Sequence, residues 1–448
     1  MDVRRLLPLP LLAVVAAGAL RVSTLFSASA VVSPDTFDYA GQSRLSLLDP
    51  AFWGSQHPPL LPLLWKPLPG LVAAVDPVKL GDLGPALFLN AIVGAACWGV
   101  LALTVASLAE SRRVRAIALL GILALSLAPE VSGWDSAAIS ESISLSLTAL
   151  ALALAIRYVR EPSRASATAL ALGLVAFALI RDSNVPLAVL GLAPVLIVTR
   201  QSRSIVVLAL VGSIGLSFWG QQAGARSSLP TRNAIANAVM RHGDAAWFRA
   251  HGMPWQSDTP ALLGERPQSA FTHDPRARDL RRWLDRDGRS TWIDYLRSHP
   301  ARSLSLGHNL PGLIDPPRGM LEQYWSGGRS PVSFFPRGVL LAFLAAFSLI
   351  GAALVARSKQ ALLFGSWFAA ALPVALLIWV LDAAEFDRHA IALPVLLRIV
   401  VIVLGVLTLD SLLALLAQRG SYAAQSIPKY VGASYERSSP AKPSPTAP

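Results

Sequence analysis

The chain has 448 residues, of which 53% are hydrophobic and 15% are charged, and its mean hydropathy is +0.50. This composition is too apolar for an ordinary soluble protein and indicates a polytopic membrane protein. The formal net charge of +12 would suit a nucleic-acid-binding protein, but the arginines lie mainly in connectors between apolar runs and in one long polar loop. Membrane topology accounts for the connectors more simply. The single cysteine, Cys97, excludes an intrachain disulfide and a cysteine-based metal site.

The N-terminal segment has two interpretations. Arg4 and Arg5 precede an apolar run that starts at Leu6, and small residues follow at 27–30, as in a cleaved signal peptide. We favour an uncleaved first span that ends near Arg21, because the later spans need an initial orientation and the two basic residues would set it.

Apolar runs along the chain predict an all-α polytopic membrane protein with about ten transmembrane helices. The runs cover residues 6–31, 84–109, 114–130, 138–156, 165–181, 185–199, 204–219, 336–356, 361–381 and 389–417. The runs 165–181 and 185–199 are shorter than the roughly 20 residues that a bilayer needs. Their connector, 181–184, is therefore expected partly within the membrane boundary, and a solvated turn is the alternative.

Basic residues are concentrated in alternate connectors, which predicts that these ends and both termini face the cytoplasm. These connectors carry Arg112, Arg113 and Arg115; Arg157, Arg160 and Arg164; Arg200 and Arg203; and Arg357 with Lys359. The remaining polar residues then fall on the extracytoplasmic side: Asp35, Asp38, His57, Asp135, Arg181, Asp182 and the loop 222–335. The polar chemistry is expected on one face of the membrane.

Four parts follow from these patterns. We expect an N-terminal transmembrane module, 1–221, with a first external loop at 33–83, then an extracytoplasmic loop domain, 222–335. C-terminal transmembrane helices, 336–418, and a disordered cytoplasmic tail, 419–448, complete the chain. Apolar spacing in 231–250 and 274–298 predicts a mainly helical loop domain. Its tryptophans are interpreted as core or interface anchors, with sugar or lipid contact as the alternative: Trp247, Trp255, Trp283, Trp292 and Trp325.

Motifs for ATP, nucleotide or zinc chemistry are absent from the sequence. The remaining candidate is the pair Asp35 and Asp38, which directly follows the first apolar run. A spacing of three places both carboxylates on one face of a helix. One could act as a general base while the other raises its pKa or helps to hold a cation. The alternative is an acidic segment that simply marks the exit of a span into water.

Several short motifs resemble the GT-C membrane glycosyltransferases, and most closely the protein-mannosyltransferase and aminoarabinose-transferase type. They are Leu20-Arg21, the run SPDTFDY at 33–39, His57-Pro58-Pro59-Leu60, Ser140-Glu141-Ser142 and the run DAAEFDRHAIALP at 382–394. The resemblance covers about the first 200 residues and this late segment. The acidic pair of that family is usually adjacent, whereas Asp35 and Asp38 are three apart. Which aspartate is the base, and whether a divalent cation takes part, therefore stays open.

The resemblance implies an inverting glycosyltransferase that moves a sugar from a polyprenyl-phosphate donor to a cell-envelope glycan, lipid or protein. It would lie in a bacterial inner membrane with its active site on the extracytoplasmic side. Asp35 is the predicted base, and Asp38 is its neighbour or replacement. The phosphate would be neutralised by arginines, because guanidinium groups bind phosphate oxygens in a bidentate way.

The predicted substrate-binding residues are Arg388, Arg21, Arg181, His57 and Glu141. Each of the three arginines has an alternative role at the lipid headgroups. His57 contacts substrate or caps the Pro-Pro turn. Glu141 orients Asp35 or an arginine, or else only favours a helix N-terminus. No metal ligand set is predicted.

Two other classes of protein stay open. A lipid or solute transporter would carry charges in the middle of its spans, whereas the acidic residues here are concentrated at the outer ends. A non-catalytic membrane assembly protein would use the outer loop as a docking surface and would have no acidic outer cavity.

Overall fold

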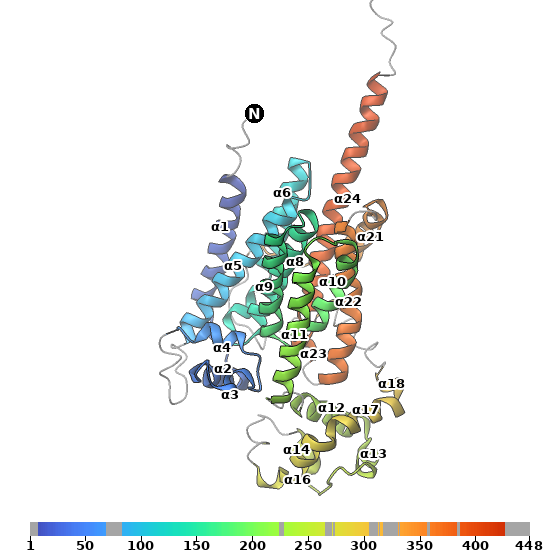
Figure 1. Ribbon diagram of the computed structural model, residues 1–448. Coiled ribbons are helices and arrows are strands. Elements are labelled where there is room, and N and C mark those ends of the chain that lie inside the picture. Colours follow the sequence, from blue (N-terminus) through green and yellow to red (C-terminus); the bar gives the residue numbers. More distant parts are fainter. Residues whose placement is uncertain are drawn as a thin grey trace, which may run out of the picture.

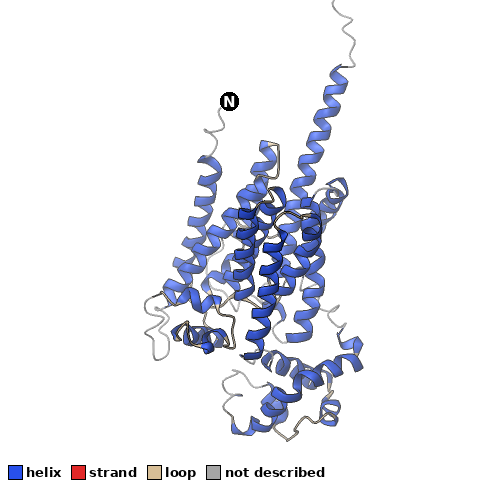
Figure 2. Cartoon of the chain, viewed as in Figure 1, coloured by secondary structure: helices blue, strands red, loops and turns tan. Residues whose placement is uncertain are grey.

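The structure is a computed structural model that describes residues 8–68, 83–223, 228–264, 271, 274–303, 312, 314–316, 330, 332–355, 359–382 and 386–425. Within these ranges the chain consists of helices and connecting loops, with a single isolated bridge between Val31 and Ala137 and no strand (Figure 2). The all-α prediction is confirmed for this part of the chain. Trp325 and the predicted tail from residue 426 on lie outside the described residues, whereas residues 419–425, predicted as disordered tail, continue the last helix.

A bundle of helices forms the main body, and each predicted apolar run overlaps one of them. They are α1 (Pro8–Ser23), α5 (Gly84–Ala106), α6 (Arg112–Ser126), α8 (Glu141–Arg160), α9 (Arg164–Ile180), α10 (Asn184–Val198), α11 (Arg203–Ala223), α21 (Gly338–Val355), α22 (Lys359–Asp382) and α24 (Ala392–Gln425). In the described residues, 6 helices are long and apolar enough to cross a membrane, or 7 if α6 and its bent continuation count as one span. The helices α9, α10 and α21 are shorter apolar helices. The chain is thus an all-α protein of the integral-membrane class, but ten complete spans are not confirmed.

Short helices gather at one end of this bundle, while the start of α1 and the last turns of α24 lie at the other end (Figure 1). The 3-10 turn η2 (Thr24–Ser27) directly follows α1, and from the first loop come α2 (Pro34–Arg44), α3 (Pro50–Trp53) and α4 (Leu60–Trp65). The break after α6 holds α7 (Pro129–Ser132) and η4 (Gly133–Ser136), and α23 (Phe386–His389) precedes α24. The long loop contributes α12 (Ser228–His242), α13 (Ala245–Ala250), α14 (Thr259–Gly264), η5 (Pro275–Ala277), α16 (Arg278–Trp283), η6 (Leu284–Gly288), α17 (Arg289–Ser298) and α18 (Pro300–Ser303).

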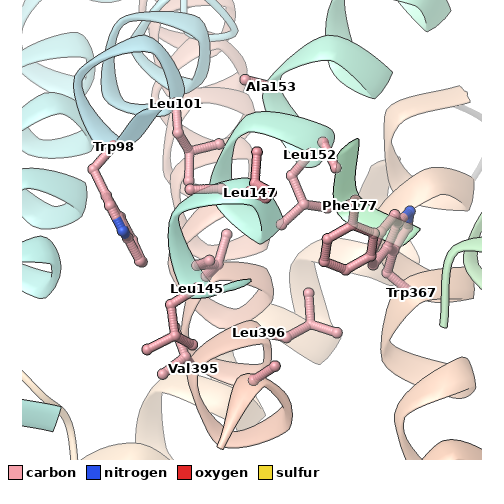
Figure 3. Close-up of a cluster of buried hydrophobic side chains, with 14 of the residues drawn as sticks. Trp98, Leu101, Leu145, Leu147, Leu152, Ala153, Phe177, Trp367, Val395 and Leu396 are labelled. Atoms are coloured by element: carbon pink, nitrogen blue, oxygen red, sulfur yellow. The ribbon is translucent and has the colours of Figure 1, made fainter. Parts of the chain in front are cut away.

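Helix α8 is the centre of the bundle core. In its most apolar 18-residue stretch, 83% of the residues are buried. The helix packs against α5, α9, α22 and α24. Its sequence alternates leucine with alanine and serine, and these small residues let neighbouring helices approach closely. Large side chains from those neighbours, including Trp98, Phe177 and Trp367, fill the remaining space (Figure 3). The packing fixes the start of α8, Glu141, at the end of the bundle where the short helices gather.

The long loop has a second hydrophobic core of its own. It is built from α12 to α17, with Trp283 and Trp292 buried in it and Trp247 and Trp255 packed against it. These four tryptophans therefore have the core role predicted for most of the set. Trp292 Nε1 also donates to the carbonyl oxygen of Val380 on α22 at 2.9 Å, which ties this unit to the bundle.

The basic connectors meet at the opposite end of the bundle. Arg160 Nη1 donates to Ser107 Oγ at 2.7 Å, which joins the end of α8 to the α5–α6 connector. Asp410 of α24 accepts from the backbone N–H groups of Glu110 at 2.7 Å and Ser111 at 3.0 Å, where a carboxylate is stabilised by the N-terminus of α6. Tyr158 Oη donates to the carbonyl oxygen of Gln201 at 2.9 Å. Three basic connectors are thus linked to one another or to neighbouring helices at a single end.

The contact between α21 and α24 gives a first prediction. A Cβ atom at Gly351 would lie 1.2 Å from Thr408 Oγ1 of α24. We expect Gly351→Ala to push the two helices apart and to lower stability by about 1–3 kcal/mol, the usual range for overpacking. Thermal unfolding in detergent measures this effect. Gly212→Ala on α11 is the matched control, because a Cβ there meets nothing within 4 Å, and an equal loss in both variants would contradict the explanation.

Candidate active site

Asp35 lies in the first turn of α2, where the helix dipole favours a carboxylate. Pro34 suits the start of this helix because its fixed φ is helical and its missing N–H is not needed there. Thr36 Oγ1 accepts from the Ser33 backbone N–H at 3.1 Å and donates to the carbonyl oxygen of Ala138 at 2.9 Å. The second bond holds the start of α2 against the segment that leads into α8, and it thereby fixes the position of Asp35 near Glu141.

Four charged side chains from distant parts of the chain form one ionic cluster at this end of the bundle. Arg388 of α23 pairs through Nη2 with Asp35 Oδ2, although the two residues are 353 positions apart. The Arg388 Nε atom lies 2.9 Å from Glu141 Oε1, and Arg181 Nη1 lies 3.5 Å from the same oxygen. We call Asp35, Glu141, Arg181 and Arg388 the ionic cluster. It brings together four of the seven residues that the sequence singled out.

The charges of the ionic cluster balance, which makes its burial tolerable. The Glu141 side chain is 0% exposed and bridges both guanidinium groups, so it orients them. The Asp35 side chain is 21% exposed and is the most accessible of the four. A reacting molecule can therefore reach a carboxylate next to a guanidinium group. This arrangement can accept a proton and bind an anion at adjacent points.

Tyr39 lies one turn after Asp35 and is buried against the cluster. Burial raises the pKa of its phenol, and the negative charges of Asp35 and Glu141 add to the effect. The ring also contacts His57, with the two centroids 4.5 Å apart. Tyr39 stays protonated at neutral pH and cannot be the base of this site.

The structure does not bring Asp38 into the ionic cluster. Asp38 Oδ2 lies 3.3 Å from His57 Nε2, and its side chain is 50% exposed. Asp35 and Asp38 are three residues apart in the helix, so their side chains point in directions about 60° apart around the helix axis. Asp35 therefore faces the bundle while Asp38 faces the first loop. Gln42 Nε2 donates to the carbonyl oxygens of Phe52 at 2.7 Å and His57 at 3.2 Å and so fixes the His-Pro-Pro turn. His57 thus contacts Asp38 and packs on Tyr39.

Arg21 lies in a separate, fully buried ion pair. Its Nε and Nη2 atoms lie 2.7 and 2.9 Å from the carboxylate oxygens of Asp135, and both side chains are at most 1% exposed. Ser142 Oγ donates to the same carboxylate at 2.6 Å. This geometry does not support the predicted contact of Arg21 with substrate, because the guanidinium group already joins α1 to η4 and α8.

A further set of charged residues was not recognised in the sequence. Arg337 pairs with Glu130 and Asp315, at 2.7 Å each, and Arg398 Nη2 lies 3.4 Å from Asp315. Arg398 is 0% exposed and lies inside the apolar run 389–417, which is the signal that could have revealed it, since a charge within such a run needs a partner.

A small cavity adjoins the ionic cluster. It is lined by Arg181, Ser183, Asn184 and His389, together with Ser144 and apolar residues of α10, α22 and α24. Among the described residues, no group of three or more His, Cys, Asp or Glu side chains is arranged to hold a metal ion. The cavity therefore offers hydrogen-bond donors and one guanidinium group to a polar or anionic ligand.

Comparisons with known proteins assign no family. No family model matches the chain, and no curated protein is similar to it. Two similar solved structures are the archaeal oligosaccharyltransferase AglB from Archaeoglobus fulgidus in complex with an inhibitory peptide and a dolichol-phosphate, and the apo form of the Archaeoglobus fulgidus oligosaccharyltransferase. Their sequence identities are 12% and 13%, their TM-scores 0.44 and 0.42, and they match 95% and 93% of this chain. The chain spans about half of the length of each, 52%. Similarity at this level determines neither family nor activity.

Proposed function

We propose that the chain is an integral-membrane glycosyltransferase of the GT-C type, which transfers a sugar from a polyprenyl-phosphate donor to an extracytoplasmic acceptor with Asp35 as general base. The observation that carries the proposal is the pairing of Asp35 with Arg388, beside Glu141 and Arg181, at one end of an apolar helix bundle. The motif resemblance in the first loop and at 382–394 supports the same assignment. The donor supplies its own leaving group, so the reaction needs no nucleotide.

The proposed reaction is one displacement at the anomeric carbon. The acceptor hydroxyl oxygen forms a bond to that carbon while its proton passes to Asp35. The bond between the anomeric carbon and the phosphate oxygen breaks, and the electron pair leaves with the polyprenyl phosphate. Attack opposite to the leaving group inverts the configuration. Arg388 and Arg181 stabilise the charge that develops on the phosphate.

Arg388 has two roles in this proposal. In the free protein it neutralises Asp35, and in the donor complex it turns to the phosphate and leaves the carboxylate available for the acceptor proton. Glu141 is a positioning residue, because it contacts both guanidinium groups from a fully buried place. Its charge keeps the two cations together before the donor arrives.

The proposed orientation places the ionic cluster outside the cytoplasm of a bacterial inner membrane, with both termini inside. Support comes from the basic connectors, which gather at the opposite end of the bundle, as cytoplasmic connectors do. The proposed parts are the transmembrane module 1–221, the loop domain 222–335, the C-terminal helices 336–418 and the tail 419–448. In this arrangement the loop domain lies next to the site and can contact the acceptor.

Replacing Arg388 with lysine tests the shape of the phosphate contact. Lysine keeps the charge but loses the planar fork that reaches Asp35 and Glu141 from different nitrogen atoms. We expect sugar transfer to fall about 10²-fold or more, as for the loss of one preorganised donor to a developing negative charge. Initial rates with a radiolabelled lipid-linked sugar measure this. Arg297→Lys in α17 is the matched control, since Arg297 is exposed and pairs only with Asp294 of its own helix among the contacts seen.

Purified protein in proteoliposomes tests the function itself. We expect covalent transfer of the sugar from a polyprenyl-phosphate donor to an added glycan, lipid or peptide acceptor, with release of polyprenyl phosphate. Chelation by EDTA then decides whether a divalent cation takes part. Movement of the lipid-linked sugar across the bilayer without covalent transfer would overturn the proposal in favour of a transporter.

A further inference from the structure

A second cavity lies on the other side of the Arg181–Asp182 turn, between the first loop and α11. Its walls come from Trp53 and the Pro58-Pro59 turn of the loop, from the end of α9 and from α11. The polar lining consists of Asp182, Ser213 and Ser217. Helices α9 and α10 are short, so their connecting turn lies beside α11 six residues before that helix ends. The cavity therefore combines aromatic and aliphatic walls with a carboxylate and two hydroxyl groups.

Two of the three polar groups lie along one face of α11. Ser213 and Ser217 are four residues apart, which places both hydroxyl groups on the same side of the helix. Ser217 Oγ donates to Asp182 Oδ1 at 2.7 Å. Ser213 is 3% exposed, and its Oγ atom has no hydrogen-bond partner within the described chain. A buried hydroxyl without a partner is unfavourable, so this group indicates a ligand that completes its hydrogen bonding.

The chemistry of the lining decides between kinds of ligand. A phosphate group would be repelled by the carboxylate of Asp182. A hydrocarbon chain would fit the apolar walls but would leave Ser213 Oγ without a partner. A sugar ring satisfies both parts, because its hydroxyl groups donate to a carboxylate and bond to serine hydroxyls while its apolar face packs on an aromatic ring. Trp219, which is 45% exposed, offers such a ring at the opening.

We propose that this cavity is a saccharide subsite, which we call the α11 cavity. Two of its lining residues are sequence neighbours of residues in or beside the ionic cluster. Asp182 directly follows Arg181 of the cluster, and Pro58 directly follows His57, which packs on Tyr39. If the proposed function holds, the α11 cavity receives the sugar that carries the attacking hydroxyl. The acceptor is then a glycan or glycosylated lipid rather than a bare peptide side chain.

Ligand-observed NMR tests the subsite without any transfer reaction. The probes are methyl glycosides of mannose, arabinose, glucose and galactose, added to the full chain in a detergent without a sugar headgroup. We expect at least one probe to bind, and we expect Ser213→Ala and Trp219→Leu to weaken its binding about tenfold or more. Ser204→Ala, at an exposed position near the other end of α11, is the matched control and keeps full binding.

Thermal unfolding separates a ligand contact from a structural one. Because Ser213 Oγ has no partner in the described chain, Ser213→Ala leaves the unfolding midpoint unchanged or raises it while it weakens sugar binding. A lowered midpoint together with unchanged binding would overturn the proposal. So would binding of no methyl glycoside, or binding of farnesyl phosphate that depends on Ser213. Loss of transfer with sugar binding intact would count against the proposed function and not against the subsite.

Discussion

Asp35→Asn is expected to reduce sugar transfer from a polyprenyl-phosphate donor by about 10³-fold, within the range that general base catalysis contributes. The amide has nearly the shape of the carboxylate but cannot accept the acceptor proton. The measurement is the initial rate of transfer at saturating donor concentration. Donor binding is expected to persist, because Arg388 loses a competing anion when Asp35 is neutralised.

Asp38→Asn is the matched variant, since it changes the same kind of residue one turn away in the same helix. We expect at most a severalfold effect, because Asp38 contacts His57 and lies outside the ionic cluster. The reverse order of the two effects would make Asp38 the base. Full turnover in both variants would contradict the assignment of a catalytic aspartate in this loop.

Hydrophobic runs in the sequence predicted the position of every bundle helix, since burial in lipid or in the core needs only continuous apolar sequence. Span number was harder to predict, because a run of 17 residues such as α9 is apolar without being long enough to cross alone. The break in α6 is a second case. Helix α6 ends at Ser126 and Pro129 starts α7, so the regular helix stops before the predicted run 114–130 ends.

The sequence singled out Asp35 as the predicted base, and the resemblance to GT-C enzymes implied Glu141, Arg181 and Arg388 as substrate-binding residues. Their pairing was not predictable, because Arg388 reaches Asp35 across 353 positions and only tertiary packing brings them together. The expected partnership of Asp35 and Asp38 instead rested on helix geometry alone. Helix geometry does not include the His-Pro-Pro turn, which Gln42 holds in place. Long-range charge pairing is therefore the part of this site that only the tertiary structure reveals.

Arg21 is another residue whose partner the sequence did not reveal. The sequence suggested a role at the phosphate because Leu20-Arg21 is one of the motifs that resemble the GT-C enzymes, yet its partner Asp135 is 114 positions away. A fully buried arginine needs a carboxylate close by. Several acidic residues lie in similar positions along the sequence, and nothing there distinguishes Asp135 from the others. Its pairing is structural, which leads to a prediction about stability rather than about catalysis.

Asp135→Asn is expected to destabilise the protein by about 3–5 kcal/mol, the usual result when one partner of a buried ion pair is removed. The Arg21 guanidinium would remain at 1% exposure without a compensating charge, and Ser142 would lose its carboxylate acceptor. Thermal or denaturant unfolding of the purified protein in detergent measures the change. Asp294→Asn is the control: Asp294 pairs with Arg297 at 3.2 Å on an exposed helix surface, and its loss is expected to have little effect.

The double variant Arg21→Leu with Asp135→Leu distinguishes an unpaired charge from lost packing. If the penalty comes from a buried charge, the double variant is more stable than either single leucine variant, because no uncompensated ion remains. Gly94→Ala disturbs the same ion pair without removing either charge, since a Cβ atom there would lie 2.4 Å from Arg21 Cζ and would displace the guanidinium group. Additive losses in the double variant would show that α1 is held by its apolar contacts alone, and the ion pair would then have no role in fixing the first helix beside the start of α8.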